Sequence, residues 1–231
     1  TLPKVAFAQS VIESSVEVAT PDGVSDCYFV RPSRGKHPGV LMWPDIKGLR
    51  PTYKAMAKQL AEAGYSVLVV NPYYRDAKAP VLGPNESFDD PDTMKFLRSM
   101  AWKLTQEVVT SDAQAYVEFL DDQISVDSNR KVGTMGYCMG GELVVLTAAA
   151  IPNRVGAVAS FHGSRSIVTD RPDSPHLLIA KSKAHALHAV AENDDQRSPE
   201  TKNIIKAAYK AAGLPAEIEV YQGTLHGWCT P

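Results

Sequence analysis

The sequence predicts an α/β fold with a mainly parallel central sheet and helices on both of its faces. Short, nearly continuous apolar runs alternate with segments of helical periodicity, as expected when strands are buried on both faces. The chain has 231 residues, an ordinary size for one α/β domain, and 44 % of them are hydrophobic, enough for a sizeable core. Two extended runs near the N-terminus are instead joined by a short polar segment, which predicts an antiparallel hairpin at one edge of the sheet.

The predicted hairpin comes first and consists of "VIESSVEV" and "DCYFVRP", joined by "ATPDGVS". The runs predicted to be buried strands follow in order: "PGVLMW" (38–43), "YSVLVV" (65–70), "KVGTMGY" (131–137), "VGAVASF" (155–161) and "ALHAVAE" (186–192). The final run, "AEIEVY" (216–221), alternates polar and apolar residues, which places it nearer an edge.

Apolar residues at helical spacing predict helices between these strands. Each of three predicted helices has its apolar residues on one face. These residues are Met56, Leu60 and Ala63 in the helix after Pro51, Ala113, Tyr116, Val117 and Leu120 in the second, and Ile204, Ile205, Ala208 and Ala212 in the third. Ser198 is predicted to cap the last helix, Pro199 to lie in its first turn and Gly213 to end it. Residues 76–92 are rich in proline and are predicted to form a long loop that walls a binding site.

Composition excludes several classes of partner. The net charge of −2 argues against binding to nucleic acid or to an anionic membrane, and no apolar stretch approaches the ~20 residues of a membrane span. The three cysteines, Cys27, Cys138 and Cys229, are far apart and odd in number, so a disulfide framework is not expected. We expect a single domain over residues 11–231, present as a monomer or small homo-oligomer.

Residues 1–10 form an N-terminal extension. Within it, Ala6-Phe7-Ala8 is similar to the small-x-small pattern of a signal-peptidase site. The extension is therefore either the remnant of an export signal, which would indicate a periplasmic protein, or an arbitrary boundary of a cytoplasmic one.

The stretch "GTMGYCMGGEL" (133–143) places Cys138 on the turn between a predicted strand and a predicted helix. A turn this sharp needs glycine two residues before and two after its centre, here Gly136 and Gly140. This is the pattern of a nucleophile elbow with cysteine in the serine position. The helix dipole favours a thiolate there, and the Met139 amide is placed to donate to an oxyanion. The alternatives are a buried structural cysteine, or a dinucleotide-binding turn, whose G-x-G-x-x-G spacing is absent.

A nucleophile elbow requires an acid and then a histidine, each after a later strand. The run "ALHAVAEND" leads into Asp194 and Asp195, and "AEIEVYQGTLHGW" carries His226. We therefore predict a triad of Cys138, Asp194 and His226, with Asp194 preferred over Asp195 because it comes first off the strand. His162 ends another strand and is predicted to border the site. The histidines lack the spacing of a metal site, and neither a metal nor another cofactor is predicted.

In these features the chain resembles the dienelactone hydrolase family of α/β-hydrolases over about residues 10–229. The resemblance rests on "GYCMGG", "WPDIKGL", "AGYSVLVVNPYYR", "AENDD" and "LHGW". It implies the α/β-hydrolase fold, a cytoplasmic location, and a cysteine hydrolase that cleaves small carboxylic esters or lactones through a thioester. It also implies a second oxyanion amide at Ile46. Asp45 stands before it, where the family has a glutamate that pairs with the resting thiol.

The chain departs from the family in several places. Asp45 is one methylene shorter than the family glutamate, so it either reaches the thiol or only forms the turn after Pro44. Arg75, in "PYYR", is the cation placed to meet an acidic substrate, or else a solvated loop arginine. No arginine follows His226, which sets the substrate apart from dienelactone. Hydrolases of this fold usually have one more helix after this histidine, and we expect it to be missing from this sequence.

Besides the ester or lactone hydrolase, two other functions remain open at this point. One is a thiol protein in which peroxide oxidises Cys138 to sulfenic acid. The other is a non-catalytic module of the hydrolase fold that binds a partner.

Overall fold

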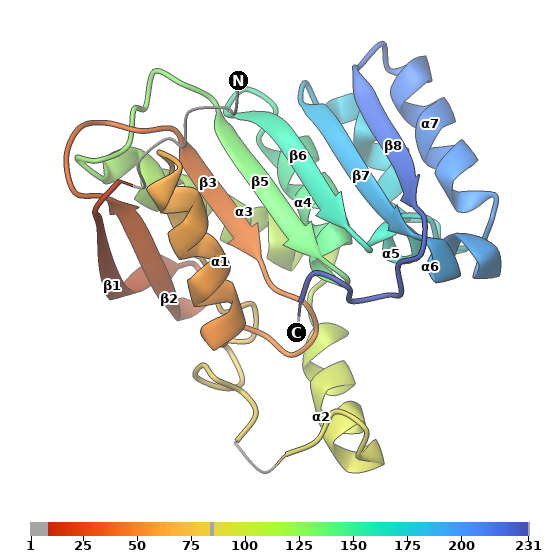
Figure 1. Ribbon diagram of the computed structural model, residues 1–231, viewed down its shortest axis with the longest axis horizontal. Coiled ribbons are helices and arrows are strands. Elements are labelled where there is room, and N and C mark those ends of the chain that lie inside the picture. Colours follow the sequence, from red (N-terminus) through yellow and green to blue (C-terminus); the bar gives the residue numbers. More distant parts are fainter. Residues whose placement is uncertain (1–8, 84–85, 231) are drawn as a thin grey trace, which may run out of the picture.

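The computed structural model describes residues 9–83 and 86–230, and these form one eight-stranded sheet flanked by helices (Figure 1). Ala6-Phe7-Ala8 lies outside the described residues. The strands are β1 (Val11–Thr20), β2 (Gly23–Pro32), β3 (Gly39–Trp43), β4 (Ser66–Val69), β5 (Val132–Tyr137), β6 (Val155–Phe161), β7 (His185–Ala191) and β8 (Ala216–Tyr221). Their order in the sheet is β1-β2-β4-β3-β5-β6-β7-β8.

The pairing of the strands confirms the predicted fold class. β1 and β2 form an antiparallel hairpin, and β2 also pairs antiparallel with β4. All other neighbours, from β4 across to β8, are parallel. The hairpin forms one edge of the sheet and β8 forms the other, as predicted from the joined N-terminal runs and from the alternating pattern of the final strand.

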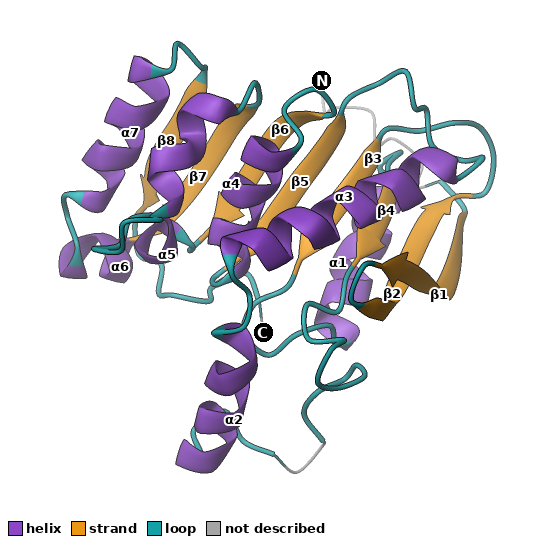
Figure 2. Ribbon diagram, turned by 180° about the vertical axis from the view of Figure 1, so that it is seen from behind, coloured by secondary structure: helices purple, strands orange, loops and turns teal. Residues whose placement is uncertain are grey.

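Helices cover the sheet unequally. They are α1 (Pro51–Glu62), α2 (Pro91–Ala101), α3 (Gln106–Asp122), α4 (Gly140–Ala150), α5 (Ser164–Ile167), the 3₁₀ helix η1 (Pro175–Lys181), α6 (Glu192–Arg197) and α7 (Thr201–Ala211). α1 lies on the front of the sheet, whereas α3 and α4 cover the back (Figures 1 and 2). Within the described residues no helix covers the front of β5 to β7, where an open groove is lined by Met135, Ala159 and Leu187.

The central strand β3 packs against a hydrophobic cluster on each face of the sheet. In β3, Leu41 and Trp43 pack into the cluster that includes α3 and α4, while Val40 and Met42 pack into the cluster under α1. Successive side chains of a strand point to opposite faces, so a strand between two helix layers needs apolar residues at every position. This explains why "GVLMW" is continuously hydrophobic.

Three helical details differ from the sequence-based predictions. α1 buries Tyr53, Ala57 and Ala61, rather than the face of Met56, Leu60 and Ala63, because small alanines let the helix approach the sheet closely. α7 begins at Thr201 after Glu200, so Ser198 does not cap it, although Gly213 follows its end with φ +69° as predicted. α2, which begins at Pro91 after the capping side chain of Asp90, was not predicted at all.

The topology brings the functional loops together. Because β3 to β8 run parallel, their carboxyl ends lie along one edge of the sheet, and this is where ligands bind in open α/β sheets. α2 and the long loop before it extend beyond this same edge (Figures 1 and 2). The candidate catalytic residues all follow strands that end here.

Candidate active site

Cys138 lies at the end of β5 in a backbone conformation that residues other than glycine seldom adopt. Its φ is +53°, and its amide donates to the Phe161 carbonyl at the end of the neighbouring strand. A Cβ added to Gly136 would lie 2.1 Å from the Gly140 carbonyl oxygen, and one added to Gly140 would lie 2.5 Å from the Trp43 carbonyl oxygen. The elbow therefore needs both glycines, because the chain crosses itself too closely for any side chain.

Replacing Gly136 by alanine is expected to destabilise the fold by about 3 kcal/mol, because backbone atoms rather than flexible side chains would have to move. Gly133→Ala is the matched control in the same strand: the nearest atom to its added Cβ is a Val40 methyl carbon at 3.8 Å. Thermal unfolding of the two variants measures the difference. Equal melting temperatures would contradict the crowding argument.

Three residues from different loops form a continuous hydrogen-bonded chain. His226 Nε2 lies 3.1 Å from Cys138 Sγ, and His226 Nδ1 lies 2.6 Å from Asp194 Oδ2. The Asp194 side chain is buried, and the side-chain oxygen of neighbouring Asn193 accepts a hydrogen bond of 2.8 Å from the His226 amide. A buried carboxylate on Nδ1 fixes the tautomer that carries its proton there, which leaves Nε2 free to accept the thiol proton.

The structure separates the two candidate acids. Asp194 faces His226, whereas Asp195 accepts hydrogen bonds of 2.6 and 2.8 Å from Lys202 on α7. The second oxygen of Asp194, Oδ1, is buried without a hydrogen-bond partner and lies 3.8 Å from the Arg165 guanidinium. Asp194 is thus ion-paired on one side and bound to the imidazole on the other.

Asp194→Asn is expected to lower ester turnover by roughly 10³-fold, because an amide cannot hold the imidazole in the required tautomer. Asp195→Asn should leave turnover within about threefold, since it weakens only a partly exposed ion pair with Lys202. Steady-state kinetics of the two variants provide the measurement. A larger loss in Asp195→Asn would reverse the assignment.

The Cys138 sulfur is within hydrogen-bonding reach of two backbone amides, those of Met139 and Ile46. Burial nevertheless raises the pKa of this thiol to about 11, and the nearby Asp45 carboxylate raises it too, although the Met139 and Ile46 amides lower it. The raised pKa points to a neutral thiol rather than to the thiolate that the helix dipole led us to expect. At neutral pH the sulfur is a thiol that must lose its proton as it reacts.

This raised pKa predicts the pH dependence of alkylation. Only the thiolate reacts with iodoacetamide, so the rate at Cys138 should continue to rise through pH 9 and 10 towards the pKa of about 11. The measurement is mass spectrometry of the Cys138 peptide after timed alkylation. A plateau reached below pH 8 would mean that a preformed thiolate–imidazolium pair exists instead.

Asp45 forms the turn after β3 rather than a contact with the sulfur. Its carboxylate accepts hydrogen bonds of 2.6 and 3.0 Å from Arg50 and one of 2.9 Å from the Lys47 amide. Of the two roles that the sequence left open, this geometry matches the turn-forming one. The buried ion pair with Arg50 occupies both carboxylate oxygens.

Arg75 does not reach the site, which corrects the expectation that it meets an acidic substrate. Its guanidinium donates two hydrogen bonds to the buried Asp112, at 2.7 and 2.8 Å, and two to Asp22, at 2.7 and 3.0 Å. It also stacks over the Tyr74 ring. Four of its five N–H groups are thereby occupied, and the side chain joins the hairpin to α3 instead of facing Cys138.

A small cavity of about 230 Å³ lies over the sulfur. Its lining residues are Asp45, Ile46, Lys47, Phe88, Cys138, His162, His226, Gly227 and Thr230. Phe88 belongs to the loop predicted as a wall, and His162 was predicted to border the site. Lys47 and Thr230 were missed, because no local pattern distinguishes them from ordinary loop residues. A larger cavity of about 490 Å³, beside β1 and α1, contains no nucleophile with a base.

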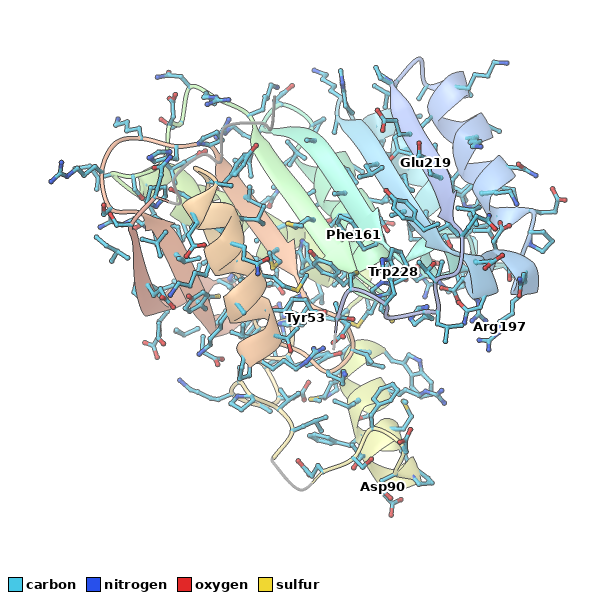
Figure 3. The ribbon with its side chains drawn as sticks, viewed as in Figure 1. Tyr53, Asp90, Phe161, Arg197, Glu219 and Trp228 are labelled. Atoms are coloured by element: carbon cyan, nitrogen blue, oxygen red, sulfur yellow. The ribbon has the colours of Figure 1, made fainter. Side chains whose placement is uncertain are left out.

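His162 is an aromatic wall of this cavity rather than a second base. Its φ is +44°, and its ring lies edge to face with the rings of His226 and Trp228. The distances between ring centres are 4.9 and 5.1 Å. Burial, and secondarily the neighbouring His226, lowers its pKa to about 4, so the imidazole is neutral at pH 7. Figure 3 shows Trp228 and Phe161 near the carboxyl edge of the sheet.

Two further observations concern only the described parts of the chain, residues 9–83 and 86–230. No three side chains among their histidines, cysteines, aspartates and glutamates are grouped so as to hold a metal ion. None of their helices combines the length and the apolar character that crossing a bilayer requires.

Comparison with known proteins relates this chain to one family. Residues 25–231 match the dienelactone hydrolase family. A carboxymethylenebutenolidase of Rhodococcus opacus is 24% identical over 189 residues, covering 82% of this chain and 69% of that protein. A candidate carboxymethylenebutenolidase of Methylorubrum extorquens is 27% identical over 225 residues, covering 96% of this chain and 74% of that one.

Solved structures share the fold. The crystal structure of a candidate dienelactone hydrolase from Klebsiella pneumoniae matches with a TM-score of 0.78 at 23% identity, covering 94% of this chain and 88% of that chain. At this level of identity the likeness concerns the fold alone.

Proposed function

The chain belongs to the dienelactone hydrolase family, and we propose that it is a cysteine hydrolase that cleaves small carboxylic esters or lactones through an acyl-enzyme on Cys138. The observation that carries this proposal is the continuous contact from Cys138 Sγ through His226 to Asp194, at 3.1 and 2.6 Å. A thiol, a base and a buried acid in this order form the arrangement used for nucleophilic acyl transfer.

In the first step Cys138 Sγ attacks the carbonyl carbon of the ester while its proton moves to His226 Nε2. The electron pair of the C=O π bond moves to oxygen, and the amides of Met139 and Ile46 donate to the resulting oxyanion. Each such donor lowers the barrier by roughly 3 kcal/mol. Collapse of this intermediate breaks the carbon–oxygen bond, and His226 gives its proton to the leaving alkoxide, which departs as an alcohol.

In the second step water attacks the thioester, with His226 Nε2 taking its proton. The carbon–sulfur bond breaks, and the proton returns to sulfur. The products are a carboxylic acid and an alcohol, with one water consumed; a lactone gives both groups on one molecule. Because the thiol is neutral at rest, proton transfer to His226 accompanies attack. Esters with good leaving groups and strained lactones are favoured over amides as substrates.

The cavity supports a small substrate. Its volume of about 230 Å³ lies below the ~300 Å³ at which pockets for drug-sized ligands usually begin. Lys47 and Phe88 line its mouth, and the Lys47 ammonium lies 5.8 Å from the centre of the Phe88 ring. With Arg75 committed to Asp112 and Asp22, Lys47 is the one lysine or arginine among the residues lining this cavity.

The test is to trap the acyl-enzyme. The protein is mixed briefly with p-nitrophenyl acetate, quenched in acid, digested and examined by mass spectrometry. We expect one acetyl group, on Cys138. The Cys229→Ser variant is the matched control because Cys229 is the other half-buried thiol, and it should acetylate normally. Acetylation that is absent, or found on Cys229 alone, would overturn the proposal.

A further inference from the structure

The two proposed oxyanion amides are held in very different ways. Met139 precedes α4, and its position is set by the elbow and by the helix, whose Glu142 amide donates to its carbonyl at 3.1 Å. Ile46 lies instead in the irregular loop between β3 and α1. A loop amide keeps its direction only if the neighbouring peptide groups are fixed from outside the loop.

Two buried tyrosines supply those fixed points. The Ile46 N–H belongs to the peptide group between Asp45 and Ile46. On the preceding side, the Asp45 amide donates to Tyr53 Oη at 2.8 Å. On the following side, Tyr73 Oη donates to the Ile46 carbonyl at 2.9 Å. The peptide group that carries the oxyanion donor is thus held between two anchored neighbours.

Tyr73 also contacts the other half of the oxyanion hole. Its hydroxyl oxygen lies 3.4 Å from Met139 Sδ, so one side chain touches both residues whose amides face the Cys138 sulfur. Its ring packs beneath the loop, because a Cβ on Gly48 would lie 3.4 and 3.5 Å from two of its ring carbons. The hydroxyl carries one proton, which the shorter bond to the Ile46 carbonyl takes, so the approach to the Met139 sulfur is a packing contact.

Tyr73 is itself rigidly held. It follows β4, and its side chain is almost fully buried. Its amide donates to Asn71 Oδ1 at 3.0 Å, and its carbonyl accepts hydrogen bonds from the amides of Asp76 and Ala77 at 2.8 and 2.9 Å. Burial raises its pKa well above the usual range, so the hydroxyl keeps its proton and remains a donor at every working pH.

We propose that Tyr73 is a positioning residue of the oxyanion hole, whose hydroxyl holds the Ile46 loop at a fixed distance from the elbow. The inference rests on the proposed function, because it concerns the same acyl transfer. The Ile46 amide matters most when negative charge develops on the carbonyl oxygen. Loss of the Tyr73 hydroxyl should therefore act on the transition state and leave binding of the neutral ester nearly unchanged.

The test is Tyr73→Phe, which keeps the ring and removes only the hydroxyl. With p-nitrophenyl acetate we expect kcat to fall by about tenfold while KM stays within about twofold. The matched control is Tyr74→Phe, one residue further along, whose hydroxyl contacts Asp112 and Thr20 and should leave both constants unchanged. Rates are expressed per Cys138 thiol titrated by iodoacetamide, so a lower folded fraction cannot imitate the effect.

Alkylation by iodoacetamide also separates positioning from a general disturbance of the site. That reaction displaces iodide at a saturated carbon and forms no oxyanion, so its rate at Cys138 should be equal in Tyr73→Phe and the unmodified protein. A tenfold loss of acylation with unchanged alkylation supports the inference. Acylation at the unmodified rate, or equal losses in both reactions, would overturn it. Failure of the proposed function would be seen separately, because the ester would then not acylate Cys138 in the unmodified protein. The inference would fall with it.

Discussion

Cys138→Ala is expected to lose ester turnover by a factor on the order of 10⁴ or more, because the proposed acyl intermediate forms on the sulfur that this variant lacks. The variant keeps the oxyanion amides and the imidazole, so a small residual rate above that of buffer should remain. The strained backbone of residue 138 favours no particular side chain, and alanine should fold as cysteine does. Hydrolysis of p-nitrophenyl acetate, corrected for folded protein, provides the measurement.

Cys138→Ser provides the informative comparison. A serine hydroxyl fits the same turn but has a much higher pKa and is a weaker nucleophile, so we expect turnover well below that of the unmodified protein and above that of Cys138→Ala. Cys229→Ser should hydrolyse the ester normally. If Cys138→Ala matched the unmodified protein, Cys138 would be a packed thiol and the hydrolase proposal would be abandoned.

His226→Ala is expected to reduce turnover about as severely as Cys138→Ala, because a buried thiol with a pKa of about 11 cannot attack at neutral pH without a base to take its proton. Groups that act as a unit are not additive, so the double variant Cys138→Ala/His226→Ala should be no slower than either single one. His185→Ala, at an exposed position on β7, is the matched control and should have no effect. Multiplying losses in the double variant would show that the two residues act independently.

The same variant separates the proposed hydrolase from the other two functions. A peroxide-reactive thiol would form sulfenic acid whether or not His226 is present, and a binding module would be unaffected by its loss. The raised pKa of Cys138 already disfavours the redox function, since cysteines that sense peroxide have low thiol pKa values and exposed sulfur atoms. Peroxide consumption by His226→Ala at the unmodified rate, together with unchanged ester turnover, would favour the redox reading.

Much of the fold and the order of the site was accessible from the sequence, because the relevant signals are local. Continuous apolar runs marked strands buried on two faces, and helical spacing marked α3 and α7. Gly136 could be interpreted without coordinates, since its close approach to Gly140 occurs within five residues, whereas the approach of Gly140 to Trp43 is a tertiary contact. The acid and the histidine were found from their order along the chain, because parallel strands bring their carboxyl ends to one edge.

Tertiary structure decided what depends on which side chains come into contact in the folded chain. Asp194 and Asp195 are adjacent and chemically identical, and only their separate contacts with His226 and Lys202 distinguish them. The sequence suggested Arg75 and Asp45 as site residues. In the structure Arg75 is ion-paired with Asp112, and Asp45 is ion-paired with Arg50.

By itself, then, the sequence determined the parallel sheet, the elbow and the chain order of thiol, acid and base, since backbone conformation and hydrophobic periodicity are encoded over short stretches. The tertiary structure decided the ionisation of Cys138, the pairing of each charge and the support that Tyr73 gives to Ile46. These depend on burial and on which side chains meet in the folded chain, because desolvation and hydrogen-bond partners exist only once the strands have come together.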